Sequence, residues 1–161
     1  MLKQRRPITP EKALERLESL CARSEQASGE LLRKLRSWGI SGSKADEIIS
    51  SLTDRRFVDD ERFAGAFVRD KVRYARWGRR KIRQALYQKG IASEIISKAL
   101  AEIDEDEYES VLAAILSAKA RTAYDITTYE GRTQLYRHGL SRGFEPDLVA
   151  RLLRALHEKN K

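Results

Sequence analysis

Apolar residues recur along the chain at helical spacing, in short stretches that end at glycine. A glycine followed by an apolar residue occurs at Gly39-Ile40, Gly90-Ile91 and Gly143-Phe144, at intervals of 51 and 53 residues. Each of these glycines follows an apolar stripe and precedes an apolar pair, and no stretch alternates as a strand would. A fixed period of this size is typical of proteins built from tandem repeats, whose terminal units often diverge.

The apolar stripes predict three helices in each repeat. In the first repeat, Ser28 should open the second helix and Gly39 should end it, because glycine takes the left-handed conformation that a helix C-terminus favours. In the second repeat, Asp59 or Asp60 should cap the first helix. A turn at Gly78 should then precede the next helix.

The predicted fold is all-α: three tandem three-helix repeats, with about nine helices, in an elongated array that is straight or curved. The expected boundaries are residues 1–58, 59–103 and 104–161. About fifty residues bury too little apolar surface to be stable alone, so neighbouring repeats should share part of their cores. The three repeats use all 161 residues, so we expect no separate catalytic domain beside them.

Composition agrees with a helical protein that functions in water, since 35% of the residues are charged and only three are proline. The single cysteine, Cys21, cannot form an internal disulfide. Residues 1–12 are basic and polar, and the longest apolar run, residues 111–116, is too short to cross a bilayer. We therefore expect a cytoplasmic protein without membrane contact. Intramolecular packing accounts for the apolar stripes, so a monomer is expected.

Positive charge is concentrated in the second repeat, in residues 69–83, which we call the basic segment. It holds eight basic residues and one acid, Asp70, and so carries seven of the eight net positive charges of the chain. On a helical wheel, Arg62, Arg69, Arg73 and Arg76 lie opposite the apolar positions. Like charges on one face repel, and an anionic partner would offset that cost. The candidate binding residues are Arg62, Arg69, Lys71, Arg73, Tyr74, Arg76, Trp77, Arg79, Arg80, Lys81 and Arg83.

Some of these residues also have a purely structural interpretation. Tyr74 and Trp77 could stack on bases or anchor a protein interface, but Trp77 could equally close the apolar seam between two helices. The helix that begins near Gly78-Arg79 offers backbone N–H groups to a phosphate or a partner carboxylate. Basic helical faces are also common in proteins without an anionic partner.

Catalytic and metal-binding patterns are weak. The two histidines, His138 and His157, have no ligand-like spacing to Cys21 or to each other. The acids at 59–61 are explained by a helix N-terminus, and no phosphate-binding loop, nucleophile elbow or paired-cysteine motif occurs. We therefore expect no enzyme activity, no metal and no cofactor.

Three stretches of the second repeat resemble the RecX family of recombinase regulators. They are residues 57–64 (FVDDERFA), 77–82 (WGRRKI) and 86–91 (LYQKGI). The resemblance continues upstream at 22–25 and 30–35 and downstream at 140–144, and so extends over nearly the whole chain. It implies tandem three-helix repeats, in agreement with the period. The first repeat departs from this pattern by about four extra residues after Gly39, and the third by Gly139.

The resemblance also implies a partner. RecX-like proteins bind the filament of RecA recombinase on single-stranded DNA and inhibit its recombinase, ATPase and coprotease activities. The hypothesis is therefore a regulator of homologous recombination and the DNA-damage (SOS) response. A general nucleic-acid-binding helical module without a RecA partner is the alternative, and an adaptor for an unrelated acidic protein is a third. The pattern leaves open whether DNA or recombinase is the main contact, and whether inhibition proceeds by capping or disassembly.

Overall fold

The computed structural model describes residues 7–161, and this part of the chain contains only helices, turns and connecting segments. The helices are α1 (Pro10–Arg23), α2 (Ser28–Ser37), α3 (Gly42–Asp54), α4 (Asp60–Asp70), α5 (Arg79–Gln88), α6 (Ser93–Ala101), α7 (Glu105–Thr122), α8 (Tyr129–Ser141) and α9 (Pro146–Lys159). A π-helical turn, η1 (Lys71–Ala75), follows α4 directly. The all-α prediction with about nine helices is confirmed over these residues.

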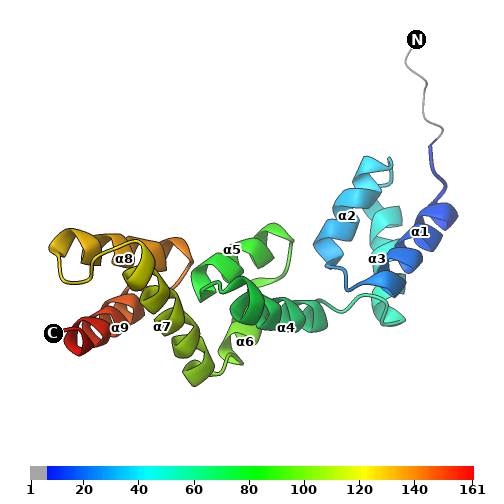
Figure 1. The fold of residues 1–161 in the computed structure, drawn as a ribbon. Helices are drawn as coiled ribbons and strands as arrows, with labels where there is room; N and C mark the ends of the chain where they lie inside the picture. Colours follow the sequence, from blue (N-terminus) through cyan, green and yellow to red (C-terminus); the bar gives the residue numbers. More distant parts are fainter. Residues whose placement is uncertain (1–6) are drawn as a thin grey trace, which may run out of the picture.

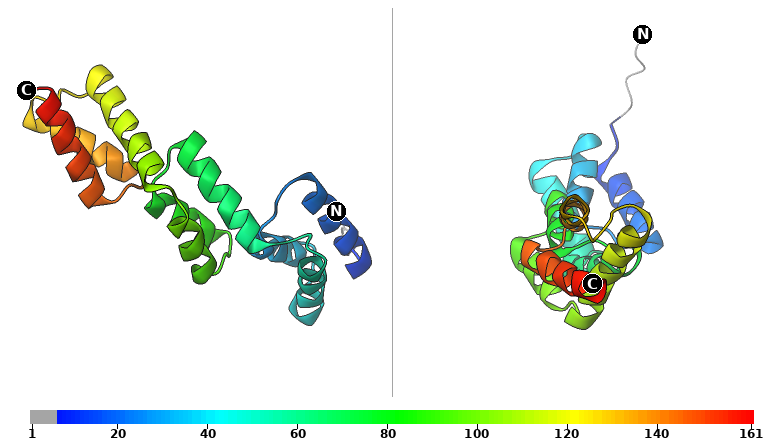
Figure 2. Two further views of the ribbon diagram at one scale, coloured as in Figure 1. Left: turned by 90° about the horizontal axis from the view of Figure 1, so that it is seen from below. Right: turned by 60° about the vertical axis from the view of Figure 1, so that its left-hand side comes forward.

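The nine helices form three sets of three along an elongated molecule (Figure 1). Helices α1–α3 lie at one end, α4–α6 in the middle and α7–α9 at the other end, and the same row is seen from below in Figure 2. The predicted tandem array is therefore present. The boundaries at 58/59 and 103/104 stay predictions, and the first six residues of the first repeat lie outside the described part.

Local sequence signals explain where the helices begin and end. The side chains of Thr9, Asp59 and Asp104 each accept a hydrogen bond from the backbone N–H three residues on, at 3.2, 3.1 and 2.9 Å. A cap of this kind typically contributes about 1 kcal/mol. The three periodic glycines follow α2, α5 and α8 with left-handed φ values of 84°, 80° and 93°, as predicted.

The apolar core is divided into two clusters. Helices α1–α3 enclose one, around Leu17, Leu31 and Leu52. A second, larger cluster is continuous through α4–α9 and includes Ile82 and Tyr108. Neighbouring repeats were expected to share their cores; the second and third do, whereas the first contributes only Ala27 to the larger cluster.

Glycine pairs join consecutive sets of helices. A Cβ atom on Gly29, at the start of α2, would lie 2.6 Å from the carbonyl oxygen of Lys89 and 2.8 Å from Cα of Gly90. A Cβ atom on Gly78, before α5, would overlap the backbone of Gly143. At the first junction, the start of α2 meets the glycine that ends α5. At the second junction, the start of α5 meets the glycine that ends α8. Gly90 and Gly143 are therefore junction residues as well as helix ends, whereas Gly39 only ends a helix.

Polar contacts reinforce the junction between the first and second sets. The Ser28 N–H donates to the Asp60 carboxylate at 2.8 Å, and Lys89 pairs with Glu30 at 2.8 Å. Asp60 therefore ties α2 to α4, while Asp59 caps α4.

Among the helices that the structure describes, none has both the length and the apolar composition that a membrane span requires.

Candidate functional site

The basic segment does not follow one continuous α-helix. Helix α4 ends at Asp70, the chain widens into η1, and Arg76 then adopts a left-handed conformation with φ 55°. The Trp77 N–H donates to the Lys71 carbonyl at 2.9 Å, which closes this turn. The wheel that placed Arg76 on the same face as Arg62, Arg69 and Arg73 is therefore wrong for Arg76, because that residue has left the helix.

Three of the predicted binding arginines form ion pairs within the chain. Arg62 contacts Glu25 at 2.7 Å, and Arg73 contacts Glu107 at 2.7 Å. Both pairs are largely exposed to solvent, and such pairs add little to stability. These two guanidinium groups are therefore held weakly, and an anionic partner can compete for them.

Arg79 is held much more firmly. Its guanidinium pairs with Glu145 at 3.0 Å and with Glu105, and it lies 4.1 Å from the centre of the Tyr108 ring. The Tyr108 hydroxyl donates to Glu145. Burial, together with that hydrogen bond, raises the pKa of the Tyr108 phenol well above its ordinary value, so the hydroxyl keeps its proton. Arg79 is therefore part of the junction between the second and third sets.

The start of α5, predicted to be available to a phosphate or a partner carboxylate, is occupied by the chain itself. The N–H of Gly78 donates to the Arg142 carbonyl at 2.7 Å. The N–H of Arg79 donates to the Tyr108 hydroxyl at 2.9 Å, and that of Arg80 to the Gly143 carbonyl at 3.0 Å. That prediction is wrong, because the third repeat supplies the acceptors.

Trp77 has a structural role, and two lysines lie against it. Its ring packs edge-on against Phe67, with the ring centres 6.4 Å apart. The ammonium groups of Lys71 and Lys81 lie 4.5 and 4.7 Å from the Trp77 ring centre. Trp77 therefore closes the seam between α4 and α5. By contrast, the Tyr74 side chain is 81% exposed.

Besides Arg73, four arginines of the basic segment are exposed to solvent: Arg69, Arg76, Arg80 and Arg83. Within residues 7–161, no ion pair involves any of the four. The guanidinium of Arg83 lies 3.4 Å from the Ser97 hydroxyl. The structure thus divides the predicted residues into those that hold the fold and those that can reach a partner.

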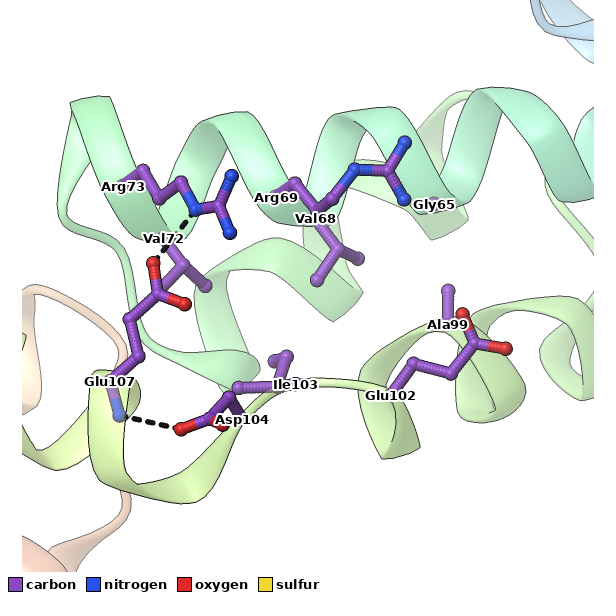
Figure 3. A pocket seen from close by; sticks show the side chains of 10 residues that line it. All are labelled: Gly65, Val68, Arg69, Val72, Arg73, Ala99, Glu102, Ile103, Asp104 and Glu107. Carbon is purple, nitrogen blue, oxygen red and sulfur yellow. Dashed lines mark hydrogen bonds and ion pairs between the residues drawn. The ribbon is translucent and has the colours of Figure 1, made fainter.

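A pocket of about 130 Å³ lies beside Arg69 and the ion-paired Arg73, between α4 with η1 and the end of α6 with the start of α7 (Figure 3). Four apolar side chains line it: Val68, Val72, Ala99 and Ile103. Arg69 and Arg73 lie on the α4 side, and Glu102, Asp104 and Glu107 on the other. A second hollow shares Gly65, Arg69, Ala99 and Glu102, so the depression continues along α4 and α6.

Sequence reasoning missed this pocket. Among the acids at 102–109, Asp104 has a local structural role as the cap of α7. The pairing of Glu107 with Arg73 joins elements 34 residues apart, which no local pattern reveals.

In the part of the chain that the structure describes, no three His, Cys, Asp or Glu side chains are placed to hold a metal ion.

Comparison with known proteins identifies the family. Residues 59–100 match the family model described as "RecX, second three-helix domain". The chain is 36% identical over 120 residues, or 72% of its length, to a protein named "Regulatory protein RecX" from Clostridium botulinum strain Eklund 17B. The chain belongs to the RecX family. A RecX-family relative of the same name, from Geobacillus kaustophilus, is 26% identical over 142 residues, or 88% of this chain.

Solved RecX structures share the fold. RecX from Lactobacillus salivarius superposes with a TM-score of 0.82 at 23% identity, covering 91% of this chain and 96% of that one. A second solved regulatory protein RecX gives a TM-score of 0.80 at 19% identity and covers 89% of this chain and 70% of that one. The chain spans about half the length of the curated relatives that it matches, 55% for the Clostridium protein and 53% for the Geobacillus protein.

Proposed function

We propose that this RecX-family chain binds the filament that a RecA-type recombinase forms on single-stranded DNA. Binding restrains strand exchange, ATP hydrolysis and the coprotease activity of the filament, and so regulates recombination and the DNA-damage response. The observation that carries the proposal is the set of four exposed arginines in the second repeat that form no ion pair with another residue of 7–161. That repeat is also the part of the chain that matches the family model.

The shape of the molecule supports action on a filament. An elongated row of helices presents a long surface, and such arrays use long surfaces to contact extended partners (Figure 2). A filament repeats its protomers along one axis, so a row of this kind can contact more than one of them. Bridging two protomers would hinder the filament rearrangements that accompany strand exchange. Capping the end of the filament would stop its growth.

Inhibition of the recombinase ATPase tests the proposal. The single-stranded-DNA-dependent ATPase of a RecA recombinase is measured while the chain is added well below one molecule per protomer. Loss of activity at these ratios supports action on the filament or its end. A protein that merely competed for DNA would need to cover most of the lattice. Inhibition that begins only when the DNA is saturated supports the general nucleic-acid-binding module instead.

A matched pair of variants locates the site. Replacing Arg69, Arg76 and Arg80 by alanine removes three exposed positive charges from the basic segment. Three exposed arginines elsewhere, Arg36, Arg121 and Arg154, give a control with the same net charge. Only the first variant should lose inhibition, with unchanged helix content. Equal loss in both would mean that net charge, and not this site, governs binding.

A further inference from the structure

Gly65 differs from every other glycine of the chain. All nine glycines lie within the described residues, and eight have a structural reason. Gly39, Gly42, Gly90 and Gly143 have positive φ. At Gly29, Gly78, Gly131 and Gly139, a Cβ atom would lie within 3 Å of another part of the chain.

At Gly65 the backbone is helical, and a Cβ atom would come within 4 Å of only one atom, Nη1 of Arg69, at 3.3 Å. That atom ends a flexible side chain. A glycine inside a helix costs about 0.5–1 kcal/mol relative to alanine. Within the described part of the chain, nothing requires a glycine at this position, although it lowers the stability of α4.

Gly65 lies at the edge of the pocket, on the α4 side, next to Arg69 (Figure 3). A larger side chain there would extend towards the space between Arg69 and Ala99. The absence of a side chain thus keeps the pocket open along α4. A glycine that is unfavourable for the helix but keeps a cavity accessible indicates that the cavity is used.

The size and lining of the pocket fit an apolar side chain. Its volume of about 130 Å³ is close to the ~150 Å³ of an apolar cavity that takes up benzene. Valine, alanine and isoleucine side chains line it. An aromatic ring or a branched aliphatic side chain would therefore be removed from water on entering.

The charges around the pocket favour a protein over a nucleic acid. Arg69 and Arg73 lie on one side, but Glu102 and Glu107 face them across the opening, and Asp104, which caps α7, lies on the same side as these two acids. A DNA backbone in this position would bring its phosphates close to the carboxylates of Glu102 and Glu107. A peptide can instead place an acid against the arginines and backbone or side-chain donors against the carboxylates.

We propose that this pocket receives an apolar side chain of the recombinase, flanked by an acidic residue that pairs with Arg69. This inference rests on the proposed function and specifies how the second repeat recognises its partner. A partner would have to displace Glu107 to reach Arg73, whereas Arg69 forms no ion pair within the described residues, so Arg69 is the more accessible cation. The apolar side chain supplies buried area at the centre of the contact, and the charges on both sides set the direction of the bound segment.

Filling the pocket tests the inference without removing a charge. Gly65→Leu adds a side chain at the edge of the pocket and replaces the glycine by a residue that favours helices. Affinity for the RecA filament should fall at least tenfold, while affinity for bare single-stranded DNA stays unchanged. Gly65→Ala adds one carbon and should change filament affinity less than threefold. Ala113→Leu, at an exposed position of α7, is the control for an added leucine and should bind as the wild type does.

Each outcome decides a separate question. If the wild type binds the filament and Gly65→Leu binds it within twofold as well, the pocket is not the contact and the proposed function survives. If Gly65→Leu loses affinity for the filament and for bare single-stranded DNA together, the occupant of the pocket is a nucleic acid. That result overturns the inference. If the wild type does not bind the filament, the proposed function fails and the inference fails with it.

Discussion

Gly78 and Gly143 lie backbone against backbone, and this contact joins the second and third sets of helices. The φ and ψ angles of Gly78, −82° and 167°, are open to any residue, so its conformation does not require glycine. The space does, because a Cβ atom would overlap the Gly143 backbone. Gly29 and Gly90 repeat the arrangement at the preceding junction. Two of the three periodic glycines, Gly90 and Gly143, therefore make equivalent contacts between neighbouring units.

Gly78→Ala should destabilise the fold by about 1–3 kcal/mol, the usual cost of forcing an extra carbon into a closely packed site. The midpoint of urea unfolding measures this change. Gly65→Ala is the matched control, because it adds the same carbon inside a helix where only the flexible end of the Arg69 side chain is close, and it should stabilise by about 0.5–1 kcal/mol. Equal stability of the Gly78 variant and the wild type would show that the junction is looser than described.

The helices could be predicted from the sequence because their signals are local. Apolar spacing, a capping side chain such as Asp59, and a left-handed glycine such as Gly90 each act within a few residues. Even Gly139, which departs from the pattern of the other repeats, lies inside an unbroken α8. A Cβ atom there would lie 2.8 Å from the Val149 side chain, so the glycine allows α9 to pack closely.

The site was only partly predictable, because its contacts join distant parts of the chain. The basic segment was identified by charge alone. Which of its arginines are free depends on partners such as Glu107 and Glu145, which lie 34 and 66 residues away from Arg73 and Arg79. No glycine or asparagine marks the left-handed turn at Arg76. The one local signal of the pocket was Gly65, a glycine within a helical stretch.

Tyr108 links the second and third repeats through its hydroxyl. Tyr108→Phe removes the acceptor of the Arg79 N–H and the donor to Glu145 in a site where the ring is fully buried. Glu145 keeps its ion pair with Arg79, but the partly buried Arg79 N–H is left without an acceptor, which should cost about 1–3 kcal/mol. Tyr74→Phe removes a hydroxyl from a side chain that is 81% exposed and should change stability by less than about 0.5 kcal/mol. Denaturant unfolding of both variants tests the difference.

Alkaline pH should weaken the fold through the same tyrosine. The pKa of Tyr108 is raised in the folded state, so its contribution to stability is complete below the ordinary phenol pKa of about 10. Above that pH the unfolded chain loses the proton and the folded chain keeps it, so the free energy of unfolding falls as pH rises. Urea unfolding between about pH 9 and 11 should show a steeper fall for the wild type than for Tyr108→Phe. Parallel stability-versus-pH curves for the two proteins would show that Tyr108 does not cause the fall in stability.

Replacing Arg76 by glycine should raise the stability of the fold and weaken binding to the recombinase filament. A left-handed conformation costs a residue with a side chain about 1–2 kcal/mol, and glycine avoids this cost. Glycine also has more conformational freedom in the unfolded chain, which offsets part of the stability gained. Arg76→Gly should therefore raise the free energy of unfolding by up to about 1 kcal/mol. Because the variant also loses an exposed guanidinium of the basic segment, its affinity for the recombinase filament should fall about fivefold, equivalent to about 1 kcal/mol.

Arg56 provides the control that separates these two effects. It is also exposed and left-handed, with φ 61°, but it lies after α3 and outside the basic segment. Arg56→Gly should give a similar gain in stability and leave filament affinity unchanged. If both variants bind the filament equally well, Arg76 is not a contact residue. If Arg56→Gly alone is stabilising, contacts of the Arg76 side chain, and not its backbone, determine the conformation after η1.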